Sequence, residues 1–329
     1  MSLRLVEMLI PAEDQDAAEK MLEEESAVLD FWYDWVSKKQ VLVKIIVSVE
    51  KSQMILDKLG EKFSHHSNFR LLLFEIKATY PIFENEEEEE KEEKISGISR
   101  EELYASVSDQ TDFTKYYVLL IAVSSIVAAL GVLRNDIAII IGAMVIAPLF
   151  GPNIALSLAT TLADYDLARR AMRANFFGIL LAFCLSIFIG VVMNVDPTTS
   201  QIVSRSTFSL GDIVLALAAG IAGAIAFTRS LLEPLIGVMV ALALLPALVT
   251  AGILFGAGYT MLSLSAFTLF LINLICINLS GVVTFFLQGI KPRQWWEADK
   301  AKKASHQAIA IWVTLLAVLV LVIIYTQWL

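Results

Sequence analysis

The chain has little cysteine and little charge. Its 329 residues include two cysteines, Cys184 and Cys276, both within long apolar runs. They provide neither a disulfide framework nor a Cys/His metal pattern, so we expect no metal site and no cofactor. Charged residues make up 18% of the chain and hydrophobic residues 57%, with a mean hydropathy of +0.68. Soluble domains average about 25% charged residues. The composition therefore excludes an ordinary soluble globular protein and favours an integral membrane protein.

The sequence also lacks the usual signatures of enzymes and of nucleic-acid-binding proteins. We find no nucleophile–base pair, metal cluster or phosphate-binding loop, and we expect no enzyme activity. The net charge is −9, and residues 84–93 read ENEEEEEKEE. Such acidity disfavours binding to nucleic acid. The N-terminus, MSLRLVEMLIPAEDQD, lacks the long apolar run of a signal peptide, and we expect none.

Charge is distributed unevenly along the chain. Residues 1–110 contain 13 Lys and Arg against 25 Asp and Glu, whereas residues 111–329 contain 12 against 9. An acidic soluble part is thus joined to a hydrophobic part. We predict a cytoplasmic domain at 1–80, an acidic linker and helix at 81–114, and a transmembrane domain at 115–329.

The first eighty residues have the mixed periodicity of an α+β domain. Two helices are predicted at Ala12–Glu25 and Val49–Phe63, and four strands at Arg4–Ile10, Val28–Val36, Val41–Val49 and Phe69–Thr79. This order is that of a ferredoxin-like domain. The fold hosts many functions, so ligand sensing and a docking or oligomerising role both remain open.

The hydrophobic part contains about seven predicted membrane spans, since about 20 apolar residues cross a bilayer as a helix. The spans are 116–133, 137–160, 174–194, 209–228, 231–255, 263–288 and 307–327. Lys and Arg favour cytoplasmic loops. With the acidic domain inside, nine basic residues fall in inner loops, against Arg134 and Arg205 outside. We therefore expect a multi-pass protein of the cell (inner) membrane, with the N-terminus in the cytoplasm and the C-terminus outside.

An internal repeat appears at an offset of 95 residues. Residues 134–146 are RNDIAIIIGAMVI and residues 229–241 are RSLLEPLIGVMVA, with Arg134 and Arg229 at equivalent positions. Each predicted repeat, 116–194 and 209–288, contains three spans. An odd number of crossings makes the two repeats inverted relative to each other. The span at 307–327 lies outside the repeat.

Proline and glycine interrupt the second span of each repeat. Residues 142–153 are GAMVIAPLFGPN, and proline frees backbone carbonyls that hydrocarbon cannot satisfy. Paired interruptions in inverted repeats point to a transport site near the bilayer midplane. The alternative is that these small residues only allow helices to pack closely. The candidate pathway residues are Gly142, Met144, Pro148, Gly151, Pro152, Asn153, Gly237, Met239 and Pro246.

Polar residues within the spans are few. Asp136 is expected to pair with Arg134 or to cap the second span. Asp212 and Glu233 fall near span ends, where a solvated or capping role is expected. Three polar residues of the sixth span are expected either to hydrogen-bond between helices or to line a pathway; they are Asn273, Asn278 and Ser280.

Two motifs carry a resemblance to a known family. Residues 141–157, IGAMVIAPLFGPNIALS, together with residues 236–247, IGVMVALALLPA, resemble the prokaryotic membrane family called domain of unknown function 389. The second motif has Leu-Leu-Pro-Ala where the family pattern has a double proline. The resemblance implies a helical membrane fold and carries no activity with it.

These features lead to two hypotheses for function. The first is a transporter or channel for a small solute or ion, built from inverted repeats and modulated by the cytoplasmic domain. The second is a sensory or scaffold protein whose spans anchor and oligomerise that domain. The expected partners are the lipid bilayer, a small solute or ion, and further copies of the chain.

Overall fold

The computed structural model describes residues 3–37, 39–66, 69–76, 100–207, 209–229 and 233–290, together with parts of 303–321. The chain divides into two compact units, Met1–Leu103 and Tyr104–Leu329. The acidic run at 84–93, most of the predicted linker, the basic loop at 291–302 and the end of the predicted seventh span lie outside the described residues.

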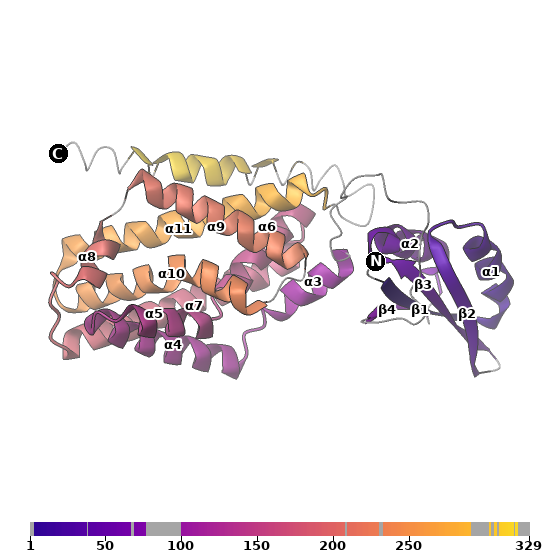
Figure 1. The fold of residues 1–329 in the computed structure, drawn as a ribbon, viewed down its shortest axis with the longest axis horizontal. Helices are drawn as coiled ribbons and strands as arrows, with labels where there is room; N and C mark the ends of the chain where they lie inside the picture. Colours follow the sequence, from indigo (N-terminus) through magenta and orange to yellow (C-terminus); the bar gives the residue numbers. More distant parts are fainter. Residues whose placement is uncertain are drawn as a thin grey trace. The chain divides into compact units, whose positions relative to one another are not determined.

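The N-terminal unit contains a four-stranded antiparallel sheet (Figure 1). The strands are β1 (Leu3–Pro11), β2 (Val28–Ser37), β3 (Gln40–Ser48) and β4 (Arg70–Ile76), in the spatial order β2-β3-β1-β4. Two helices, α1 (Gln15–Glu23) and α2 (Val49–Phe63), connect the strands, and a 3₁₀ turn, η1 (Ala12–Asp14), precedes α1. The element order is the one predicted from the sequence.

The core of this unit lies between one face of the sheet and the two helices. Alternate residues of β1 and β3 are buried, as expected from the period of two in a strand. Val6 and Met8 of β1 and Ile45 of β3 pack with Leu22 of α1 and Leu59 of α2. The opposite face of the sheet keeps Trp32, Leu72 and Phe74 exposed.

The second unit is helical. Its helices are α3 (Arg100–Asp109), which contains the boundary between the units, α4 (Lys115–Leu133), α5 (Ile137–Ile146), α6 (Phe150–Leu162), α7 (Tyr165–Val192), α8 (Ser200–Ser206), α9 (Leu210–Thr228), α10 (Glu233–Gly256) and α11 (Thr260–Leu287). Helix α10 is central, because it contacts α7, α11, α5, α4 and α9 (Figure 1). Residues 309–318 form a further helical segment.

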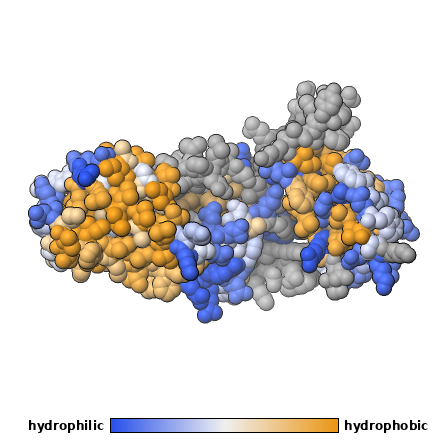
Figure 2. Space-filling view, turned by 90° about the horizontal axis from the view of Figure 1, so that it is seen from below, coloured by the Kyte–Doolittle hydropathy of each residue, from blue (hydrophilic) through white to orange (hydrophobic). Residues whose placement is uncertain are grey.

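Several of these helices are long and apolar enough to cross a membrane. Among the described residues there are four, α4, α7, most of α9 and α11, and a fifth if the bent pair α5–α6 forms one span. Figure 2 shows apolar residues covering one face of this unit. Large apolar side chains exposed on the helices of this unit include Leu119, Phe176, Phe188 and Val214. A contiguous apolar surface of this kind suggests insertion into a membrane.

Short polar side chains begin these helices. Thr114 accepts a hydrogen bond from the Tyr117 N–H at the start of α4, and Asp164 caps α7 in the same way. Asp136 accepts from Ala138 N and Ile139 N at the start of α5, so it caps the helix as expected. Asp212 forms a capping box with Ser209 at the start of α9. These caps satisfy N–H groups that apolar helix ends would otherwise leave without partners.

Glycines allow α7 and α10 to approach closely. A Cβ atom added at Gly190 of α7 would lie 2.2 Å from the Ile253 carbonyl oxygen of α10. A Cβ added at Gly256 of α10 would lie 2.2 Å from the Ile187 carbonyl oxygen. Such contacts between backbones are typical of small residues in membrane helix interfaces.

We predict that Gly190→Ala destabilises the helical unit, because the added methyl group forces α7 away from α10. Overpacking of this kind costs about 1–3 kcal/mol. Gly142→Ala is the matched control, since a Cβ there would meet no atom within 4 Å. Thermal unfolding in detergent should show a lower midpoint for Gly190→Ala only. Equal midpoints for the two variants would contradict this view of the interface.

Candidate functional site

The predicted interruption of the second span is a break between two helices. Helices α5 and α6 meet at a bend of 50°. Ala147 has extended backbone angles, φ −71° and ψ 117°, as expected for a residue that precedes proline. Pro152 lies in the first turn of α6, where a missing N–H removes no helical hydrogen bond. The two prolines therefore end one helix and permit the start of the next.

A buried cluster of three asparagines lies beside this break. Asn153 of α6 donates to Asn175 Oδ1 of α7 at 3.1 Å, and Asn175 donates back to Asn153 Oδ1 at 3.3 Å. Asn278 of α11 donates to the same Asn153 Oδ1 at 3.0 Å. Asn153 Nδ2 also donates to the Leu149 carbonyl oxygen at 2.8 Å, next to the break. Side-chain amides thus connect three helices around the start of α6.

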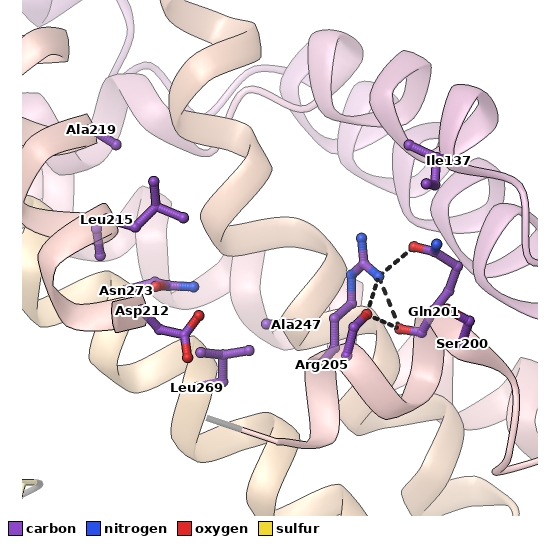
Figure 3. Close-up of a pocket in the computed structure, with 12 residues that line it drawn as sticks. Ile137, Ser200, Gln201, Arg205, Asp212, Leu215, Ala219, Ala247, Leu269 and Asn273 are labelled. Atoms are coloured by element: carbon purple, nitrogen blue, oxygen red, sulfur yellow. Dashed lines mark hydrogen bonds between the residues drawn. The ribbon is translucent and has the colours of Figure 1, made fainter. Parts of the chain in front are cut away.

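A pocket of about 490 Å³ lies at a different place in the helical unit (Figure 3). It is enclosed by α8, the beginnings of α5 and α9, the middle of α10, and α11. Its polar lining consists of Ser200, Gln201, Ser204, Arg205, Asp212 and Asn273. Its apolar wall consists of Ile137, Leu215, Ala216, Ala219, Ala247 and Leu269. The volume is in the range of small-molecule sites.

Two opposite charges line this pocket. Figure 3 shows Asp212 and Arg205 on opposite sides of Ala247. Arg205 Nη1 donates to Gln201 Oε1 at 2.6 Å and to the Gln201 carbonyl oxygen at 2.9 Å. Burial lowers the pKa of the Arg205 guanidinium, but the ordinary value lies so far above neutrality that the group stays charged. Asp212 Oδ2 accepts from Ser209 N at 2.6 Å and from Ser209 Oγ at 3.0 Å.

The predicted pathway residues of the first repeat fall in different environments. Met144 is buried in α5, whereas Gly142 lies on an exposed face of the same helix. Pro148 is half-buried in the break. Gly151 and Pro152 are buried, and the Gln110 side chain packs against Gly151.

The predicted residues of the second repeat lie on α10. Pro246 is buried within α10, and the helix continues through it. The predicted interruption of the second span is therefore present at α5–α6 and not at α10. The backbones of Gly237 and Met239 are helical, and the Met239 side chain lies outside the described part of the chain. Arg134 and Arg229 are exposed residues that directly follow α4 and α9.

The structure separates the two roles expected for the polar residues of the sixth span. Asn278 hydrogen-bonds between helices, whereas Asn273 lines the pocket. Sequence reasoning did not find Asn175, Gln201 or the place of Arg205 in a pocket. A polar residue in an apolar helix was the available signal for Asn175.

Comparisons with known proteins agree with the motif resemblance. Residues 144–279 match the family model described as domain of unknown function (DUF389). An uncharacterized protein of Methanocaldococcus jannaschii is 41% identical over 283 residues, which are 86% of this chain and 87% of that protein. No solved structure matches.

These matches agree with the fold, which is a mostly helical unit of four or five long apolar helices and a small N-terminal antiparallel sheet. The chain belongs to the DUF389 family.

We predict that Asn153→Leu destabilises the helical unit, because Asn175 and Asn278 lose their shared partner. The expected loss is about 1–2 kcal/mol, as for hydrogen bonds between membrane helices. Replacing all three asparagines by Leu should recover part of this loss, since no buried amide then lacks a partner. Thermal unfolding in detergent measures both effects. Ser265→Ala is the control and should change nothing, because this half-buried serine of α11 donates its hydrogen bond to the Met261 carbonyl oxygen of its own helix. A triple variant less stable than Asn153→Leu would contradict this explanation.

Proposed function

We propose that this chain is a multi-pass transporter of a small solute in the cell membrane, built from two inverted three-span repeats, with its N-terminal unit in the cytoplasm. The observation that carries the proposal is an asymmetry between equivalent regions of the two repeats. In the second repeat, α9, α10 and α11 line the pocket together with α8. In the first repeat, the equivalent positions of α4 and α7 are filled by packed side chains.

The helix boundaries support the repeat. Helices α4 and α9 both have 19 residues and start 95 positions apart, and α7 and α11 both have 28 residues and start 95 positions apart. The turns before α7 and α11 also correspond. Ala163 and Gly258 both have positive φ, at 56° and 87°. Asp164 N donates to the Ala159 carbonyl oxygen at 2.8 Å, and Tyr259 N donates to the Leu254 carbonyl oxygen at 2.9 Å.

Contacts between the repeats correspond as well. A Cβ added at Gly281 of α11 would lie 2.6 Å from Ser157 Oγ of α6. A Cβ added at Gly252 of α10 would lie 2.5 Å from Ser186 Cβ of α7. Adding 95 to Ser157 gives Gly252, and adding 95 to Ser186 gives Gly281. A two-fold relation between the repeats accounts for both contacts at once, because it exchanges α6 with α10 and α7 with α11.

The equivalent of the pocket in the first repeat is closed. Subtracting 95 from Asp212, Leu269 and Asn273 gives Tyr117, Ala174 and Gly178. Tyr117 OH donates to the Ala174 carbonyl oxygen at 2.9 Å, and a Cβ at Gly178 would lie 2.6 Å from that hydroxyl oxygen. Inverted repeats that differ in this way open a site to one side of the membrane while closing it to the other, as alternating access requires.

The orientation rests on the distribution of arginine. Arg169, Arg170 and Arg173 lie at the start of α7, and Arg229 lies in the loop after α9. These loops fall on the same side in the proposed topology, and positive residues favour the cytoplasm. The pocket then faces the outside, because α8 follows the outer end of α7.

We predict that Thr198 and Tyr165 lie on opposite sides of the membrane. Both residues are exposed. In a Cys184→Ser background, which removes the exposed native thiol, a membrane-impermeant maleimide applied to intact cells should label Thr198→Cys. It should label Tyr165→Cys only after permeabilisation. The reverse pattern would overturn the orientation, and labelling of both variants in intact cells would overturn the three-span repeat.

We predict that adding bulk to the pocket lining slows transport. Purified protein in liposomes should take up labelled alanine, lactate or ethanolamine, which are a zwitterion, an anion and a cation of similar size. Ala219→Leu, which adds bulk to the pocket lining, should lower uptake by about tenfold. Ala218→Leu, at the exposed neighbouring position of α9, should leave uptake within about twofold. Uptake no faster than in empty liposomes for all three probes would contradict the proposal.

A further inference from the structure

The pocket contains a separated pair of opposite charges. Arg205 comes from α8 and Asp212 from the first turn of α9. Both side chains belong to the described part of the chain, and they form no ion pair with each other there. An arginine and an aspartate that line one partly buried pocket without pairing each leave a charge that a ligand group of opposite charge can satisfy.

Each charged group retains capacity to bind a ligand. The hydrogen bonds of Arg205 to Gln201 and Ser204 all use Nη1, whereas a guanidinium carries five N–H donors. The contacts of Asp212 with Ser209 all use Oδ2, and a carboxylate has a second oxygen that can accept hydrogen bonds. Arg205 can therefore still pair with a carboxylate and Asp212 with an ammonium group.

The space between the charges suits a compact ligand. Figure 3 shows Ala247 between Asp212 and Arg205. Ala216 and Ala219 also line the pocket, and small side chains leave room for a solute. Leu215 and Leu269 provide an apolar wall against which a short hydrocarbon side chain can pack.

The charges of the lining residues select against a ligand with one charge. An anion bound by Arg205 would also experience the negative charge of Asp212, and a cation bound by Asp212 would experience the positive charge of Arg205. A ligand that carries both charges at its two ends satisfies both residues. Free amino acids have this chemistry, with a carboxylate and an ammonium on a small frame.

We propose that the pocket binds a small zwitterion of the free amino acid class, with its carboxylate toward Arg205 and its ammonium toward Asp212. This inference rests on the proposed transport function, since it assigns the class of solute.

The test is direct binding to the full chain in detergent, measured by isothermal titration calorimetry. The probes are alanine, leucine and phenylalanine, each compared with its amide, which is a cation, and with its N-acetyl derivative, which is an anion. At least one free amino acid should bind about tenfold or more tightly than both of its derivatives, since loss of one charge pair costs about 1.4 kcal/mol or more.

Charge-neutral variants then switch the preference. Arg205→Gln should bind the amide better than the free amino acid, because only Asp212 remains charged. Asp212→Asn keeps an oxygen for the Ser209 cap and should bind the N-acetyl derivative better. Thermal unfolding checks that both variants remain folded, and Asp196→Asn, at an exposed position of the loop before α8, is the control that should bind as the unmodified chain does.

Three outcomes overturn the inference: no free amino acid binds, a derivative binds as tightly as its parent, or the variants weaken binding without a switch in preference. Binding with the predicted charge pattern but without uptake into liposomes would overturn the transport function and leave the zwitterion site standing. Uptake of lactate or ethanolamine without the predicted charge pattern in binding would overturn the zwitterion site and leave the transport function standing.

Discussion

The arrangement of the helical unit depends on close contacts between helix backbones at glycine and serine. Where α7 meets α10, Gly190, Gly252 and Gly256 leave no room for a β-carbon. Where α6 meets α11, Gly281 lies against Ser157. In a membrane, apolar side chains gain little by leaving lipid, so van der Waals contact and hydrogen bonds must hold helices together. Small residues make such contact possible, and they set the positions of the broken α5–α6 segment and of the pocket.

The two repeats of the proposed topology differ in structure. In the first repeat, Pro148 separates α5 from α6, and Asn153 joins the start of α6 to α7 and α11. In the second repeat, α10 continues through Pro246, and its next residue, Ala247, lines the pocket. Asn153 thus fixes helices to one another, while Asp212 and Asn273, together with residues of α8, line a cavity.

Much of the architecture could be predicted from the sequence, because local patterns determine it. Changes in the apolar period and β-branched content predicted β1, β2 and β3 to within one residue, and the Val49–Phe63 helix has the predicted bounds. Proline chemistry predicted the break near residues 147–149. The seven spans and their inverted repeat are still predictions, since the described residues give four or five candidate spans.

The candidate site was harder to predict, because it depends on contacts between distant segments. Nothing local places Arg205 and Asp212 in one pocket, since this depends on how α8 packs against α10 and α11. The glycine pattern also did not reveal which face each residue occupies, and Gly142, expected to lie on a pathway, is on an exposed face of α5. Asn175 went unnoticed because its partner, Asn153, is on another helix.

An electron cryomicroscopy structure of the full chain in lipid nanodiscs tests the central claim most directly. The account predicts that α4–α7 superimposes on α9–α11 by a rotation of about 180° around an axis in the membrane plane. A rotation axis along the membrane normal, or two repeats that cannot be superimposed, would contradict it.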